Sequence, residues 1–207
     1  MVIDLHTLEV DMELRKLVGG EIRNLKLFGK NEDRLIVVTR GGYVFLFTMN
    51  YRRQTAKVVS QYKINLIKNR LEEPISISVC DKHQYALVEA RGFKMDYLTS
   101  RMMIFQVSED KLVKKAVMDV FRHQVPHKVA LEFYGYVGEH LLWVGLTVSK
   151  KGHVQVFDYH PRKKELREVR EKRIEHQEKH PRKVQRVGDE FYYTGTDGKI
   201  MKFALSF

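Results

Sequence analysis

Residues 74–92 read PISISVCDKHQYALVEARG, and this stretch shows how the rest of the chain is organised. Two short apolar segments, ISISV (75–79) and YALVEA (85–90), flank the polar turn CDKH (80–83). Segments of this length, rich in β-branched and aromatic residues and bounded by polar turns, are typical of consecutive antiparallel strands. The stretch therefore predicts a β-hairpin.

The same alternation of strand and turn recurs along most of the chain, where helical periodicity is weak. Further strands are expected at 35–39, 43–47, 102–107, 141–148, 153–159, 191–196 and 199–205. The apolar second strands are spaced by 50, 56 and 50 residues, since they begin near Leu35, Tyr85, Leu141 and Phe191. Regular spacing of this kind predicts one all-β domain over residues 1–207, built from a repeated unit.

Each repeat follows one plan: a first strand, a polar turn, an apolar second strand, a third strand and a more polar outer segment. The repeats span about 21–66, 74–120, 127–175 and 182–207, and the fourth lacks its outer strand. The N-terminal segment 2–10 (VIDLHTLEV) is a surplus strand. Because an unpaired strand edge is a liability, closure of a ring by this segment would resolve both irregularities.

The layout resembles a divergent β-propeller of the WD40-like class. Residues 74–92 look like its inner strand pair, and TDGKIMKFAL (196–205) looks like a turn followed by a third strand. VQVFDY (154–159) looks like a third strand that ends in a variant of the Trp-Asp dipeptide, with Phe157 and Asp158 in that place. The resemblance implies a role in scaffolding and protein–protein interaction.

About four blades can be counted, fewer than the seven that WD40-like rings usually have. Three architectures remain open at this point. The chain could form a closed four-bladed propeller, or an open partial propeller completed by another chain or by a second copy. It could also form a curved or sandwich-like β domain without ring closure.

The charge is strongly basic, with a formal net charge of +11. Residues 160–183 contribute +5 of it, from ten Lys or Arg and five Glu. A basic surface attracts polyanions, and the candidate contacts are Arg52, Arg53, Lys57, Arg162, Lys163, Lys164, Arg182 and Lys183. The interleaved Glu residues weaken this interpretation. We predict that 165–174 forms an outer strand, in which charge is expected, with a short helix as the alternative.

No catalytic, cofactor or metal signature is found, so we expect no enzyme activity, no cofactor and no metal. The single cysteine, Cys80, ends an apolar strand and is expected to be a structural thiol and not a nucleophile. The single tryptophan, Trp143, lies in an apolar strand and is expected in the core. The N-terminus has no signal-peptide pattern and no segment is apolar enough to span a membrane. These features favour a cytoplasmic or nuclear location.

The segment RGFKMDYLTSR (91–101) is expected to be a long loop in place of a tight turn. Loops on rigid β scaffolds often contact partners, and Phe93, Met95 and Tyr97 are the candidate contacts. The alternative is a loop that folds back on its own repeat. The sequence therefore favours a non-catalytic protein-interaction scaffold, a subunit of a larger assembly. The alternative is a basic RNA- or DNA-binding module within a ribonucleoprotein or chromatin complex.

Overall fold

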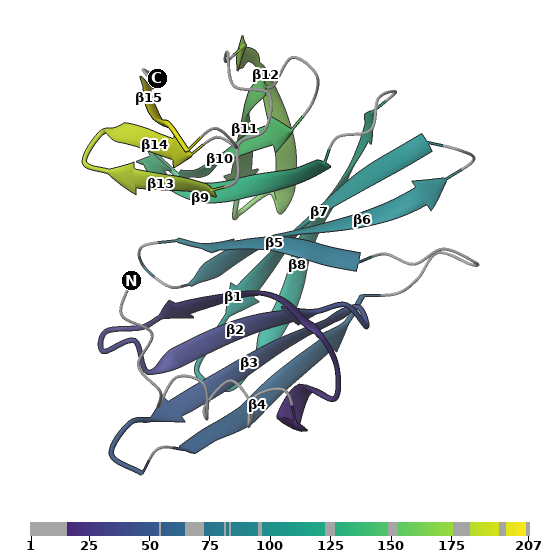
Figure 1. Cartoon of the computed structure of the whole chain (residues 1–207), viewed down its shortest axis with the longest axis vertical. Helices are drawn as coiled ribbons and strands as arrows, with labels where there is room; N and C mark the ends of the chain where they lie inside the picture. Colours follow the sequence, from purple (N-terminus) through teal and green to yellow (C-terminus); the bar gives the residue numbers. More distant parts are fainter. Residues whose placement is uncertain are drawn as a thin grey trace.

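Four antiparallel β-sheets follow one another along the chain and are arranged as an arc (Figure 1). This computed structural model describes residues 16–205 except 54, 65–72, 81, 83, 95–96, 123–126, 149–152, 176–182 and 195–197. The predicted all-β, propeller-like fold is therefore confirmed. The expected N-terminal strand 2–10 lies outside the described residues, and the described chain begins with a short helical turn at 16–18.

Each sheet takes its strands in sequence order. The first sheet contains β1 (Ile22–Phe28), β2 (Arg34–Thr39), β3 (Tyr43–Asn50) and β4 (Thr55–Lys63). The second contains β5 (Glu73–Val79), β6 (Tyr85–Lys94), β7 (Tyr97–Val107) and β8 (Leu112–Arg122). The third contains β9 (His127–Val137), β10 (His140–Val148), β11 (His153–His160) and β12 (Glu165–Glu175). The fourth contains β13 (Lys183–Val187), β14 (Glu190–Thr194) and β15 (Ile200–Ala204).

The repeat extends to irregularities in strand pairing. The third and outer strands of the first three sheets each pair with a register shift, at Leu46/Phe47, Ile104/Phe105 and Val154/Val156. A shift of this kind bends a strand and increases its twist. The turns between the first two strands of the third and fourth sheets are also alike. Gly138 and Gly188, which lie in these turns, both have a φ near +60°, which glycine adopts without strain.

Hydrophobic cores form between successive sheets. The core between the first and second sheets includes Ile36, Leu46, Val88 and Phe105. The core between the second and third contains Leu87, Ile104, Trp143 and Phe157. The core between the third and fourth contains Val144, Val156, Phe191 and Tyr193. Among the described residues, no core cluster joins the fourth sheet to the first, and the two lie at opposite ends of the arc (Figure 1).

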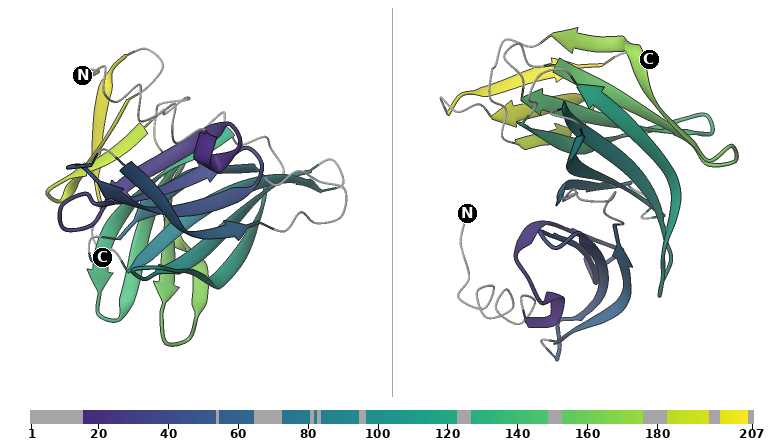
Figure 2. Two further views of the ribbon diagram at one scale, coloured as in Figure 1. Left: turned by 90° about the horizontal axis from the view of Figure 1, so that it is seen from below. Right: turned by 90° about the vertical axis from the view of Figure 1, so that its right-hand side faces the viewer.

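The first sheet has a second apolar side, turned away from the second sheet, which we call the first end face. The residues buried there are Leu35, Val37, Phe45 and Phe47. Val18, from the helical turn, packs against them on this side. The nearby Leu25 and Leu27 on β1 remain 43% and 39% exposed. Figure 2 shows the curvature of this sheet and the helical turn beside it. The first end face is therefore only partly covered.

The expected core position of Trp143 is confirmed, and Cys80 is buried in the same core. Trp143 is fully buried, and its indole packs edge-on against Phe133 with ring centroids 5.2 Å apart. Cys80 is also fully buried, and its sulfur accepts a hydrogen bond from the backbone N–H of Tyr85 at 3.2 Å. Both residues belong to the core between the second and third sheets.

Strand pairing shows the secondary structure of two segments, 165–174 and 91–101. The prediction of an outer strand at 165–174 is confirmed by β12, which pairs with β11. The prediction of a long loop at 91–101 is wrong, because β6 and β7 stay paired as far as Lys94 and Tyr97. Residues with strand propensity on both sides extend the ladder, which leaves only Met95 and Asp96 between the strands.

The buried Tyr159 makes alkaline pH destabilising. Burial, with a smaller contribution from the neighbouring Tyr85, raises the pKa of Tyr159 to about 12. An unfolded tyrosine titrates near 10, so between these two values the unfolded chain loses the phenolic proton first. The free energy of unfolding then falls as pH rises, by an amount on the order of 2 kcal/mol.

This prediction is checked by urea unfolding near pH 9 and pH 11.5, with Trp143 fluorescence as the signal. Other groups also titrate in this range, so the informative quantity is the difference between the wild type and Tyr159→Phe. We expect a smaller loss of stability in the variant. Equal losses in both proteins would show that Tyr159 does not ionise on unfolding.

Candidate functional site at the turn end of the third sheet

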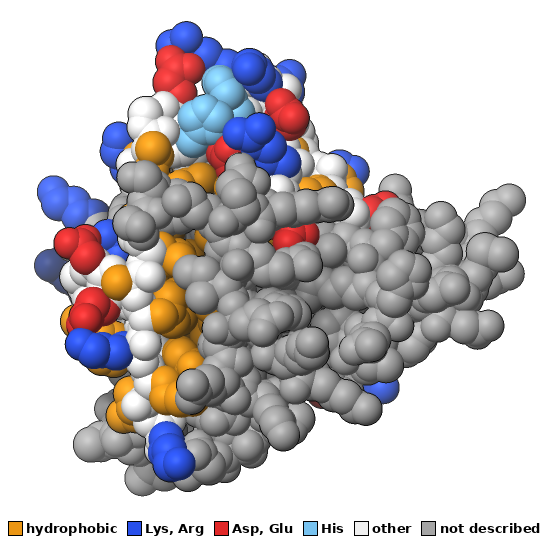
Figure 3. Space-filling model, turned by 90° about the horizontal axis from the view of Figure 1, so that it is seen from above, with side chains coloured by type: hydrophobic (Ala, Val, Ile, Leu, Met, Phe, Trp, Pro, Cys, Tyr) orange, Lys and Arg blue, Asp and Glu red, His pale blue; other side chains and the backbone are white. Residues whose placement is uncertain are grey.

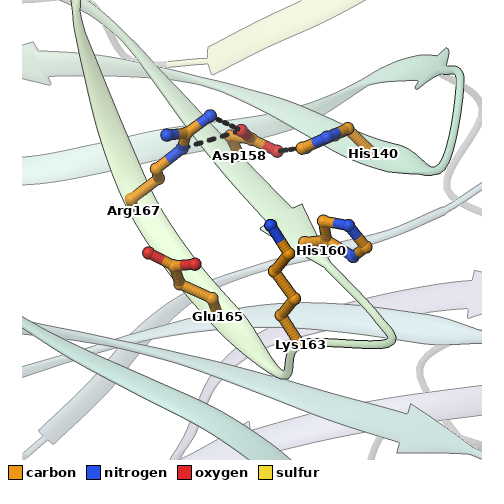
Figure 4. A pocket seen from close by; sticks show the side chains of 6 residues that line it. All are labelled: His140, Asp158, His160, Lys163, Glu165 and Arg167. Atoms are coloured by element: carbon orange, nitrogen blue, oxygen red, sulfur yellow. Dashed lines mark hydrogen bonds and ion pairs between the residues drawn. The ribbon is translucent and has the colours of Figure 1, made fainter.

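A small polar hollow lies where the third sheet ends in its two turns. Six side chains line it: His140, Asp158, His160, Lys163, Glu165 and Arg167 (Figure 4). Its volume is about 50 Å³, enough for a small polar group. Figure 3, which looks down on the end of the molecule that carries the fourth sheet, shows histidine side chains among basic and acidic ones, and a separate band of hydrophobic side chains.

Strand pairing places the acid and its partners. Phe157 points into the core, so the next residue along β11, Asp158, points to the opposite side of the sheet. Asp158 lies directly opposite Arg167 on β12. Its Oδ2 accepts a hydrogen bond from Nε of Arg167 at 3.0 Å and forms an ion pair with Nη2 at 2.9 Å. The other carboxylate oxygen is 2.8 Å from Nδ1 of His140 on β10. One carboxylate thus joins three adjacent strands.

Asp158 is almost completely buried, with 6% of its side chain exposed, whereas the Arg167 side chain is 61% exposed. A buried carboxylate is costly unless its oxygens are hydrogen-bonded. Here both oxygens have partners. We therefore interpret the cluster of His140, Asp158 and Arg167, called the Asp158 cluster, as a structural contact that holds the strands together at this end of the third sheet. In it, the negative charge of Asp158 is balanced by the positive charge of Arg167.

A second pair of histidine and carboxylate, His160 and Glu139, lies beside the Asp158 cluster. The rings of His140 and His160 meet edge-on, with centroids 4.7 Å apart. Glu139 forms an ion pair with Arg162 at 2.8 Å and lies 4.0 Å from Nε2 of His160. The buried Nδ1 of His160 has no hydrogen-bond partner among the described residues.

The chemistry of the hollow is that of its six described lining side chains. None of these six is Ser, Thr or Cys, so among them the pair of His140 and Asp158 has no hydroxyl or thiol to activate. Within the described part of the chain, no group of three His, Cys, Asp or Glu residues is placed to hold a metal ion. The arrangement is best suited to fixing the strand ends and presenting the turn that follows β11.

The predicted polyanion contacts are divided among three sheets. Arg52 and Arg53 lie in the turn after β3 and Lys57 on β4, all exposed, whereas Arg162, Lys163 and Lys164 lie exposed in the turn after β11. Arg182 is outside the described residues, and Lys183 begins β13. Arg162 is already paired with Glu139. The candidate contacts that the structure describes therefore come from three different sheets.

The predicted partner-contact residues lie on the hairpin of β6 and β7 rather than on a loop. Phe93 is in β6 and Tyr97 begins β7, while Met95 is outside the described residues. Their role as partner contacts remains a prediction.

Sequence reasoning found Asp158 only as a variant of a dipeptide and missed His140 and His160. Their proximity depends on the register between β10 and β11, in which Leu142 lies opposite Asp158. One sequence signal could have pointed to His140. The motifs VGEH at 137–140 and VGDE at 187–190 repeat at the turn between the first two strands of the third and fourth sheets. This repetition marks equivalent turns and places His140 at the start of a strand.

Comparison with known proteins identifies the fold. No protein-family model and no curated protein sequence matches the chain. Among solved structures, a 6-phosphogluconolactonase-like protein of Bacteroides fragilis has a TM-score of 0.56 at 13% identity, covering 89% of this chain and 51% of that one. The β-propeller domain of Cps50 (Swd1) from Myceliophteria thermophila has a TM-score of 0.55 at 13% identity, covering 89% and 54%.

The C-terminal WD40 domain of Sif2 is also similar, with a TM-score of 0.53 at 8% identity, covering 89% of this chain and 46% of that one. At these identities the similarity establishes the fold alone. The chain is a β-propeller-like protein that spans about half the length of the solved propellers it matches. Among the described residues, no helix is both long and apolar enough to cross a membrane.

Proposed function

We propose that this chain is a divergent WD40-like propeller segment and acts as a non-catalytic protein-interaction scaffold in a larger cytoplasmic or nuclear assembly. The observation that carries the proposal is the unfinished fourth sheet. Its order is β13-β14-β15, whereas the other three sheets each have a fourth, outer strand. Within the described residues, the outer edge of β15 pairs with no strand.

In the described structure, hydrophobic side chains near the outer edge of β15 are incompletely covered. The third strands β3 and β11 each have a run of fully buried residues, whereas no residue of β15 is fully buried. Met201 and Phe203 face the core between the third and fourth sheets but are only partly buried. A strand placed beside β15 would cover these two side chains and pair with the backbone groups that point away from β14.

A protein partner fits this edge because an extended segment can add to a sheet through main-chain hydrogen bonds. Alternate side chains of that segment would lie against Met201 and Phe203, so apolar residues at every second position are expected in the partner. The divided basic residues and the balanced Asp158 cluster favour neither the nucleic-acid alternative nor catalysis. We therefore carry only the scaffold proposal forward.

Hydrogen exchange tests the proposed edge. The tagged chain is used to capture its partner from cells that express it naturally, and the partner is identified and produced separately. On complex formation, we expect exchange of the amides of residues 200–204 to slow by about tenfold or more, because they become part of a paired ladder. The turns at 51–53 and 161–164 are the internal control. Protection confined to those turns would place the partner elsewhere and overturn the proposed edge.

A further inference from the structure

We propose that two copies of this chain close head to tail, with the first sheet of each copy packed against the fourth sheet of the other. The side of the fourth sheet turned away from the third is called the last end face. The proposal does not depend on the partner strand at β15, because the sheets would meet through their faces and leave the outer edge of β15 open.

Exposed hydrophobic residues are concentrated at the two ends of the arc. Nine large hydrophobic residues are exposed in the described chain, and five of them lie at its ends. Leu17 (46% exposed) is in the helical turn beside the first end face, where Leu25 and Leu27 also lie. Val187 and Ile200, on β13 and β15, are 57% and 72% exposed.

Strand alternation determines which side these residues occupy. Val184 and Met201 pack into the core between the third and fourth sheets. Val187 is three residues from Val184, and Ile200 precedes Met201, so both point to the last end face. By the same alternation, Phe28 faces the second sheet, while Leu27 and Leu25 point to the first end face. The two ends therefore present apolar side chains outward.

The two end faces correspond to surfaces that already pack against each other inside the chain. Each inner sheet meets its predecessor with one face and its successor with the other. The first end face is equivalent to the side that the later sheets turn toward a predecessor. The last end face is equivalent to the side that the earlier sheets turn toward a successor. The ends are therefore complementary in kind.

The geometry favours a second copy over closure within one chain. The first and fourth sheets lie at opposite ends of the arc, with the second and third sheets between them (Figure 1). Two arcs related by a two-fold axis would form two identical joints and leave neither end face open. The resulting ring would have eight sheets, two copies of four, which is within the four to eight blades of known propellers.

Chain length and charge are compatible with this arrangement. The chain spans about half of the solved propellers that it matches, so a second copy would supply a comparable remainder. On the last end face, the Lys202 ammonium is 2.8 Å from the Glu190 carboxylate, which also accepts a hydrogen bond from the Tyr192 hydroxyl at 2.6 Å. This ion pair is neutral as a unit and can lie at the rim of a joint.

Light scattering coupled to gel filtration tests the proposal. The wild type is expected at twice the chain mass of 24.5 kDa at micromolar concentration. Leu25→Glu changes the first end face and Ile200→Lys the last, and each should give the single-chain mass, because either substitution spoils both joints. Val117→Lys is the matched control, since Val117 is 44% exposed on β8, away from both ends, and should leave the mass doubled.

Mixing the two single-chain variants distinguishes head-to-tail closure from other dimers. In an equimolar mixture, one joint brings the Leu25→Glu and Ile200→Lys substitutions together, and the other joint has wild-type residues on both sides. We therefore expect the doubled mass to return. A wild type of single-chain mass, a mass other than two copies, or a mixture that stays at the single-chain mass would each overturn the proposal. None of these results would alter the hydrogen-exchange test at β15.

Discussion

Replacing Trp143 with alanine is expected to lower the free energy of unfolding by about 3–5 kcal/mol. Trp143 is the largest fully buried side chain and lies in the core that joins the second and third sheets. Its removal leaves a cavity against Phe133, and the strand ladder on both sides prevents full collapse of that cavity. A domain of ordinary stability would lose a large part of its margin.

The matched control is Trp143→Phe. The indole Nε1 of Trp143 is buried and has no hydrogen-bond partner among the described residues, so phenylalanine removes an unsatisfied donor while it keeps most of the ring. Because an unsatisfied buried donor itself costs about 1–3 kcal/mol, we expect the phenylalanine variant to stay within about 1.5 kcal/mol of the wild type. Urea unfolding followed by far-ultraviolet circular dichroism compares the three proteins. Equal destabilisation by both substitutions would contradict this account.

Replacing Asp158 with alanine is expected to cost about 2–3 kcal/mol, since hydrogen bonds to charged groups contribute about 1.5–3 kcal/mol. The carboxylate on β11 contacts His140 on β10 and Arg167 on β12, so its loss removes these side-chain contacts between the three strands. The cost is limited because the Arg167 side chain is mostly exposed and can be solvated by water. Urea unfolding monitored by Trp143 fluorescence measures the change.

A surface pair nearby provides the control for Asp158. Arg162 and Glu139 are 2.8 Å apart, but the Arg162 side chain is 80% exposed. Exposed ion pairs contribute about 0–1 kcal/mol, so Arg162→Ala should have a small effect. Asp158→Ala combined with Arg167→Ala should cost less than the sum of the two single changes, because both remove the same interaction. Additive effects would show that the two side chains do not act as a unit.

Much of the fold could be predicted because strands and turns leave local signals. The apolar run around Trp143 and the hairpin at 74–92 are both in the structure as strands, and the charged stretch 165–174 is an outer strand. Alternation survives in that stretch at Leu166, which is buried, while its neighbour Arg167 is exposed. Local patterns of this kind reflect which face of a sheet is covered.

The errors and omissions concern information that is not local. The segment 91–101 looked like a loop because Gly92 and Asp96 interrupt its apolar pattern, but cross-strand pairs such as Phe93 with Leu98 extend the hairpin. The cluster of His140, Asp158 and Arg167 depends on the register of three strands. A register shift of one residue would turn Asp158 to the other side of the sheet, and composition alone does not determine it.

The open arc has a consequence for how the protein melts. Because the hydrophobic cores between sheets in the described part of the chain each join neighbours in sequence, stability accumulates along a line, as in repeat proteins, and each terminal sheet packs against one other sheet. Heat or denaturant should therefore release the fourth sheet before the interior pair, and Trp143, in the third sheet, would report only the later event. If two copies close into a ring, every sheet gains two neighbours, so early fraying should disappear and the melting temperature should rise with protein concentration.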